Sequence, residues 1–85
     1  MKKIIEEVAG EGLESLLGKR VTLFCLNYFY TGNLIGVNET DVLLSDAHII
    51  YETGAFDSGK WADAQKVADE LYVRTSAIEA YAVIW

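Results

Sequence analysis

The last fourteen residues, YVRTSAIEAYAVIW at positions 72–85, place the strongest constraint on what this chain can fold into. The ends of domains normally fray and are polar, whereas this segment is mostly apolar and finishes on Trp85. Its side chains must therefore be covered by protein, within the chain or across an interface. The segment also holds Arg74, the only basic residue after Lys66, so it raises the question of a binding site as well.

The size of the chain limits how the fold can be stabilised. A domain of 85 residues buries only about 60% of the surface that its unfolded chain exposes, so its stability is marginal without further burial. The single cysteine, Cys25, excludes an internal disulfide and favours a reducing compartment. With His48 as the only histidine, the chain lacks a typical zinc ligand set, and we expect no cofactor. Self-association remains the common route to more burial.

The charge of the chain restricts its partners. Thirteen acidic and seven basic residues give a net charge of -6, which disfavours non-specific binding to nucleic acid because that binding depends on Lys and Arg. Any contact with nucleic acid must then be local. The first nine residues lack the apolar core of a secretory signal, and no apolar run is long enough to span a bilayer. We therefore expect a cytoplasmic protein without a membrane partner.

Residues 1–17 are predicted to form an N-terminal α-helix. Apolar residues recur at roughly helical spacing, and the pattern is clearest over residues 13–17. Gly18 follows the last apolar pair and suits the stop of a helix. From Val21 onward the pattern changes to that of strands, starting with VTLFCL at 21–26, which carries apolar groups on both faces.

Four further strands are expected after the first. The second covers residues 28–37 and places Gly32 and Gly36 on one face, which permits the sharp coiling of small barrels. The third covers residues 42–52, and the last two cover 71–75 and 78–84. Residues 53–70 form a connection in which a helical turn is possible, because Trp61, Ala64, Val67 and Ala68 would share a face. The predicted class is mostly β: an N-terminal α-helix followed by a strongly bent five-stranded antiparallel sheet that forms a small open barrel.

The order of several short motifs resembles the Sm-like (LSm/Hfq) family. The motifs are GKRV at 18–21, LFC at 23–25, GNL at 32–34, NETDVLLSDA at 38–47 and YVRTSAI at 72–78. The resemblance implies a single Sm-like domain over residues 1–85. It divides the chain into an N-terminal helix (1–17), a first motif (18–52), a variable connection (53–70) and a second motif (71–85).

The same resemblance implies a site for single-stranded RNA at two turns. In the family these turns bind a base through an Asp, a stacking residue and an Asn of the first turn and an Arg-Gly of the second. Here Thr40 offers no ring for stacking, and Thr75 stands in place of the glycine. The implied RNA-binding residues are Asn38, Thr40, Asp41, Arg74, Thr75 and Ser76.

The resemblance also answers the question raised by the apolar final residues. Sm-like subunits close into rings because the fourth strand of one subunit pairs with the fifth strand of the next, which leaves no open sheet edge. A homo-oligomeric ring of about five to seven subunits is therefore expected. The implied interface residues are Leu71, Val73, Ile78 and Val83.

Several residues have a structural and a functional interpretation. Arg74 is either a surface residue paired with Glu70 or Glu79, or a donor repeated around the pore of a ring. His48 is read as a half-exposed strand residue and Cys25 as a small core group. The aromatic residues of segment 24–30 are either packed inside the protein or a stacking platform.

No enzyme is expected, because the sequence offers no nucleophile with a base, no paired carboxylates in a pocket and no phosphate-binding loop. Two functions remain open. One is a ring that binds single-stranded RNA at its pore. The other is an acidic ring or barrel that serves as a protein interaction module without RNA binding.

Overall fold

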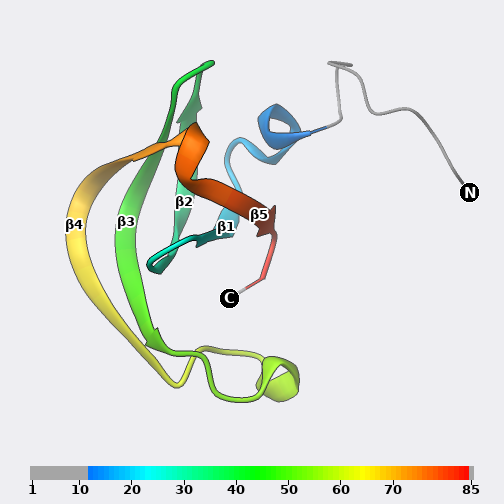
Figure 1. Ribbon diagram of the computed structural model, residues 1–85, viewed down its shortest axis with the longest axis vertical. Coiled ribbons are helices and arrows are strands. Elements are labelled where there is room, and N and C mark those ends of the chain that lie inside the picture. Colours follow the sequence, from blue (N-terminus) through cyan, green and yellow to red (C-terminus); the bar gives the residue numbers. More distant parts are fainter. Residues whose placement is uncertain (1–11, 85) are drawn as a thin grey trace, which may run out of the picture.

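A computed structural model describes residues 12–84 as one strongly bent antiparallel sheet (Figure 1). The strands are β1 (Arg20–Cys25), β2 (Phe29–Val37), β3 (Asp41–Glu52), β4 (Asp63–Arg74) and β5 (Ile78–Ala82). Three short 3-10 helices accompany them: η1 (Leu13–Leu16), η2 (Phe56–Ser58) and η3 (Thr75–Ala77). The prediction of a mostly β fold with five antiparallel strands is confirmed.

The strands lie in the order β4-β3-β2-β1-β5, so β4 and β5 are the two edges of the sheet. Figure 1 shows β3 and β4 as a long curved hairpin, with β1 and β5 on the other side of the bend. Within the described chain the two edge strands do not pair with each other. The expected barrel therefore stays an open, curved sheet, and two rows of backbone groups lack strand partners.

The N-terminal α-helix that we predicted is not found over residues 12–17. Those residues form the single turn η1, in which the Ser15 and Leu17 amides donate to carbonyls three residues earlier. Gly18 follows at φ 87°, a left-handed conformation that glycine adopts readily. Because the chain turns there to enter β1, the apolar run at 13–17 is too short to build an α-helix. Residues 1–11 of the predicted helix lie outside the described residues.

The core lies on the concave face of the bent sheet. Its buried members come from all strands except β5 and are Val21, Leu23, Cys25, Leu34, Val42, Leu44, Ala47 and Val73. The interpretation of Cys25 as a small core group is confirmed, and burial raises the pKa of its thiol. Two buried threonines have hydrogen bonds for their hydroxyls: Thr22 donates to the Ile84 carbonyl at 2.6 Å and Thr31 to the Val21 carbonyl at 3.0 Å. The second of these bonds ties β2 to β1, and the first holds the residues after β5 against β1.

The sharp bend of the sheet depends on Gly32 in β2. A Cβ atom at this position would lie 2.9 Å from the Ser45 carbonyl oxygen and 3.1 Å from Cβ of Leu44. One register shift between β2 and β3 falls at this site, between Thr31 and Asn33, and a second follows between Leu34 and Gly36. Such irregularities increase local twist and bending. The prediction that glycine in this strand permits tight coiling is therefore supported by a close backbone approach.

The connection at 53–70 is largely strand and loop, and the expected helical turn is wrong. β4 begins at Asp63 and pairs with β3 from Glu52 back to Asp41, so that ladder satisfies the backbone groups that a helix would have bonded internally. Trp61 is buried whereas Val67 is exposed, so the two residues do not share an apolar face. The loop before β4 instead folds back, and Trp61 packs edge-on against Phe24 of β1, with ring centroids 6.5 Å apart.

Candidate functional site

Two turns that are distant in the sequence meet at one end of the sheet. The first is residues 38–40 between β2 and β3, and the second is η3 between β4 and β5. The Thr75 amide donates to the Thr40 carbonyl at 2.9 Å, and the Thr75 hydroxyl donates to the Glu39 carbonyl at 2.9 Å. At the adjoining strand ends, Asp41 of β3 is paired with Arg74 of β4. The structure thus brings together five of the six expected site residues, and exposed Ser76 follows in η3.

Asn38 holds the first turn in shape through its side-chain oxygen. Oδ1 accepts hydrogen bonds from the Thr40 amide at 2.8 Å, the Asp41 amide at 2.8 Å and the Thr40 hydroxyl at 3.2 Å. Asn and Asp commonly stabilise turns in this manner because their side chains reach the backbone two or three residues ahead. Since the two amides can only donate, the atom facing them must be oxygen. The amide nitrogen of Asn38 is consequently turned away from the turn.

Arg74 stands at the end of β4 with most of its side chain exposed. Its Nε lies 3.5 Å from Oδ1 of Asp41, and the Arg74 side chain is 72% exposed. The carboxylate that Arg74 contacts is therefore that of Asp41, and not that of Glu70 or Glu79 as one of the two interpretations of the sequence expected. A solvent-exposed ion pair contributes only about 0–1 kcal/mol. The guanidinium can therefore leave this carboxylate for a ligand at little cost.

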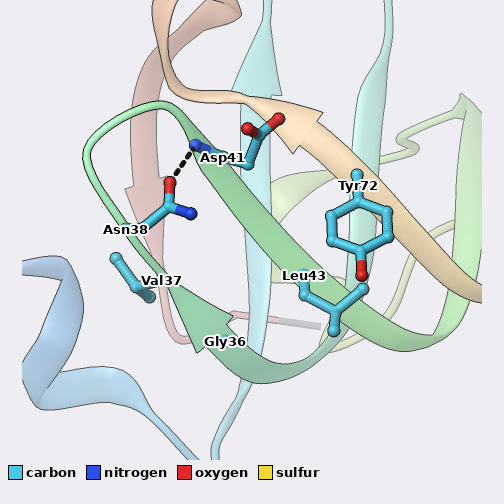
Figure 2. A pocket seen from close by; sticks show the side chains of 6 residues that line it. All are labelled: Gly36, Val37, Asn38, Asp41, Leu43 and Tyr72. Atoms are coloured by element: carbon cyan, nitrogen blue, oxygen red, sulfur yellow. Dashed lines mark hydrogen bonds between the residues drawn. The ribbon is translucent and has the colours of Figure 1, made fainter.

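A pocket of about 250 Å³ opens beside the first turn (Figure 2). Asn38 and Asp41 form its polar side, and Leu43 of β3 pairs with Tyr72 of β4 next to it. The remaining lining residues are Gly36 and Val37. Sequence reasoning missed four of the lining residues, because their meeting depends on the register of β3 with β2 and β4; they are Gly36, Val37, Leu43 and Tyr72. The only visible signal was one aromatic residue, Tyr72, two positions before Arg74.

The expected interface residues lie on the two edge strands or directly after them. Val73 is buried in the core, and Leu71 and Ile78 pack against it. Val83 follows β5 and is 52% exposed. Three of the four side chains therefore already serve the subunit itself, while the backbones of β4 and β5 form the open edges. Val83 is the interface candidate whose side chain has no such role in the core.

A second polar cluster lies on β1, β3 and β4 away from the two turns. Arg20 Nη1 lies 3.1 Å from Oδ2 of Asp46, and Nη2 lies 3.3 Å from Nδ1 of His48. Lys66 Nζ is 3.6 Å from Oδ1 of Asp46 and 2.7 Å from Oδ1 of Asp69. The hydrogen bond from Arg20 lowers the pKa of Asp46. Each cation of the cluster thus lies beside a carboxylate, and the cluster links three strands. His48 is half-buried on β3, as expected for a strand residue with a structural role.

The aromatic residues of segment 24–30 mostly contact each other and the loop before β4. Phe24 and Phe29 meet edge-on with ring centroids 4.8 Å apart, and Tyr28 and Tyr30 are 6.4 Å apart. Phe24, Phe29 and Tyr30 are partly buried, and Tyr28 is exposed. Packing inside the protein thus explains most of this segment. The observation weakens the alternative of a stacking platform there.

Neither a metal-ligand cluster nor a membrane-spanning helix occurs in residues 12–84. No group of three or more His, Cys, Asp or Glu side chains in this part of the chain is arranged to hold a metal ion. The same residues include no helix with the length and apolar character needed to cross a membrane.

Comparison with known proteins identifies the fold. No protein-family model matches the sequence, and no curated protein matches it significantly. Among solved structures, the chain is similar to the Sm protein of Pyrococcus abyssii in complex with a uridine heptamer. The TM-score is 0.57 at 21% identity, and the alignment covers 80% of this chain and 86% of the Sm protein. The chain described here therefore has the Sm-like fold.

Proposed function

We propose that this protein assembles into a homo-oligomeric ring and binds single-stranded RNA where the turns 38–41 and 74–76 meet. The observation that carries the proposal is the pair of hydrogen bonds from Thr75 to the first turn, which places Arg74 beside Asn38 and Asp41. The similar fold of an Sm protein that was solved with a uridine heptamer supports the same assignment. A ring would repeat Arg74 once per subunit and so gather positive charge that a single subunit lacks.

The edges of the sheet support the assembly part of the proposal. Strands β4 and β5 are both open and differ in length and sequence, so pairing one with the other joins subunits head to tail. Head-to-tail contacts generate a closed ring when the rotation between subunits closes. Open edges otherwise promote uncontrolled aggregation. Exposed apolar side chains of Tyr81, Val83 and Ile84 accompany the β5 edge, and such a patch would be covered in the ring.

Replacing Val83 with aspartate is expected to shift the protein from the ring toward a monomer of 9.4 kDa. The reason is that a charge would be buried without a partner at the subunit contact, whereas exposed Val83 contributes little to the core. Light scattering coupled to size exclusion measures the mass. Tyr51→Asp is the matched control, because Tyr51 is 57% exposed on β3, an interior strand. A monomeric parent protein, or an unchanged mass in Val83→Asp, would contradict the proposed assembly.

The RNA part of the proposal is tested by titrating the parent protein with short uridine-rich and adenosine-rich single strands and with an RNA duplex. We expect weak binding at low salt that favours single strands, since unpaired bases can be splayed out and reached by side chains. Fluorescence anisotropy of labelled RNA measures the affinity. If the parent protein bound none of these RNAs at low salt, the proposed RNA binding would be wrong. The alternative function, a protein interaction module, would then be favoured. The net charge of -6 and the lack of an aromatic side chain at Thr40 already support that alternative.

A further inference from the structure

The pocket beside the first turn combines an aromatic ring, an apolar floor and one amide donor. Tyr72 is 67% exposed, and Leu43, its partner across β3 and β4, is partly buried. Val37 also lines the pocket, although its side chain packs against the core. In Figure 2 the amide nitrogen of Asn38 points toward the side of the pocket where Leu43 and Tyr72 stand. Three hydrogen bonds to Oδ1 fix this orientation of the amide.

We propose that this pocket holds one unpaired nucleobase, which stacks on the Tyr72 ring and accepts a hydrogen bond from the amide nitrogen of Asn38. The inference rests on the proposed RNA binding and names the stacking residue for it. Thr40 has no aromatic side chain for stacking, and Tyr72 of the nearby strand β4 provides one instead. Arg74 lies two residues after Tyr72 on β4. It is therefore close enough in the chain to bind the nucleotide next to the stacked base.

The size and charge of the pocket favour a base over other ligands. A volume of about 250 Å³ falls below the range of about 300–1,000 Å³ that encloses drug-sized molecules, so the pocket suits a single ring system. Asp41 contributes a carboxylate to the rim, with Oδ1 3.5 Å from Arg74 and Oδ2 2.8 Å from the Thr40 hydroxyl. This negative charge disfavours a phosphate inside the pocket. A neutral base with a carbonyl or ring nitrogen can accept from Asn38 instead.

The position of Tyr72 is compatible with ring assembly. Strands pair within the plane of a sheet, whereas side chains stand roughly perpendicular to it. Tyr72 shares a face with Leu43, opposite to the face on which Val73 is buried. Pairing of the β4 edge with another subunit therefore leaves that face of the tyrosine open. Gly36, which pairs with Leu43 on the same face, adds no side chain that would fill the pocket.

The test is anisotropy titration of a short labelled single-stranded RNA with the parent protein and three tyrosine variants. Tyr72→Ala is expected to weaken binding about 5- to 150-fold, the range that corresponds to the loss of one stacked base. Tyr72→Phe retains the ring and is expected to bind like the parent. Tyr51→Ala removes another exposed ring, on a residue that is 57% exposed and lies outside the pocket, and is expected to have no effect. Light scattering on each variant checks that the mass is unchanged.

A second variant probes the hydrogen bond independently of stacking. In Asn38→Asp the side-chain oxygen still accepts from the Thr40 and Asp41 amides, so the turn is retained, but the donor toward the base is lost. Weaker binding by Asn38→Asp at both low and moderate salt supports the contact. Equal affinity of Tyr72→Ala and the parent would overturn the inference while leaving the proposed RNA binding intact. The inference would also be overturned if Tyr72→Ala dissociated the oligomer and left the affinity for RNA unchanged. Tyr72 would then be a subunit contact and not a stacking residue.

Failure of the parent protein to bind any RNA strand would remove the proposed function, and the pocket can then be examined alone. Uridine and adenosine, which carry no phosphate, are titrated into ¹⁵N-labelled protein. Shifts at the Gly36 amide and the Asn38 side-chain amide would support a base site. Unchanged spectra at millimolar nucleoside would overturn it.

Discussion

Replacing Trp61 with alanine is expected to lower the free energy of unfolding by about 3–5 kcal/mol, the usual cost of removing a buried aromatic side chain. Trp61 is only 7% exposed and contacts Phe24 and Phe56 with ring centroids 6.5 Å and 5.8 Å away. Small domains have total stabilities of about 5–15 kcal/mol, so this loss is a large share. Urea denaturation followed by circular dichroism measures it.

The matched variant Trp61→Phe separates ring packing from the indole N–H. Trp61 Nε1 is buried without a hydrogen-bond partner among residues 12–84, and such a group carries a desolvation cost of about 1–3 kcal/mol. Phenylalanine keeps an aromatic contact with Phe24 and removes that cost, so a smaller loss than for alanine is expected. Phe56→Ala should also have a small effect, because Phe56 is largely exposed. A loss below about 1 kcal/mol in Trp61→Ala would instead mean that the loop before β4 is dispensable.

Most of the sheet could be predicted because its signals are local. Alternation over residues 21–26 and the polar turn NETD mark strands and their ends without reference to the rest of the chain. Gly32 signals a bend for the same reason, since a residue without Cβ in an apolar strand indicates close approach of another backbone. The resemblance to a known family then supplied what alternation alone does not: the meeting of two turns that are distant in the sequence, which the hydrogen bond between Thr75 and Thr40 bears out.

The sequence predictions that were wrong or incomplete concern segments whose conformation depends on residues distant in the chain. The spacing of Trp61, Ala64 and Val67 suits a helix, yet β3 pairs with β2 on one edge only. Its other edge, along a strand of twelve residues, pairs with β4, and this ladder replaces the helix. The choice of Asp41 over Glu70 or Glu79 as the partner of Arg74 follows from the Asp41–Arg74 register, which no local pattern reveals. The same holds for the pocket, since a bulge between Leu34 and Gly36 decides that Gly36 faces the side of Leu43 and Tyr72.

Replacing Arg74 with alanine is expected to abolish binding of single-stranded RNA without changing the oligomeric mass. The subunit carries a net charge of -6, so most of its surface repels the ligand and binding must depend on a few donors at one place. Arg74, the last residue of β4, is the only basic residue within segments 38–41 and 74–77, where the two turns meet. Its side chain is 72% exposed and Arg74 is not a member of the core cluster, so its loss should leave the fold and the β4 edge intact.

Two further variants define what Arg74 contributes. Lys66→Ala removes the same charge from β4 at a distance from the turns, where Lys66 pairs with Asp46 and Asp69, and is expected to change affinity little. Arg74→Lys keeps the charge but loses the planar fork that matches a phosphate or a base edge, so an intermediate affinity is expected. Anisotropy titrations at several salt concentrations distinguish these cases.

The salt dependence gives an independent measure of the same site. Each phosphate neutralised on a single strand contributes about 0.7 to the slope of log affinity against log salt. Few contacts are available, so the parent slope should be shallow. Because Arg74 supplies the cationic contact, the slope for Arg74→Lys should match that of the parent even though the affinity is lower. A steep slope in the parent, or unchanged affinity in Arg74→Ala, would mean that RNA is held by other cations, and the site at the two turns would have to be abandoned.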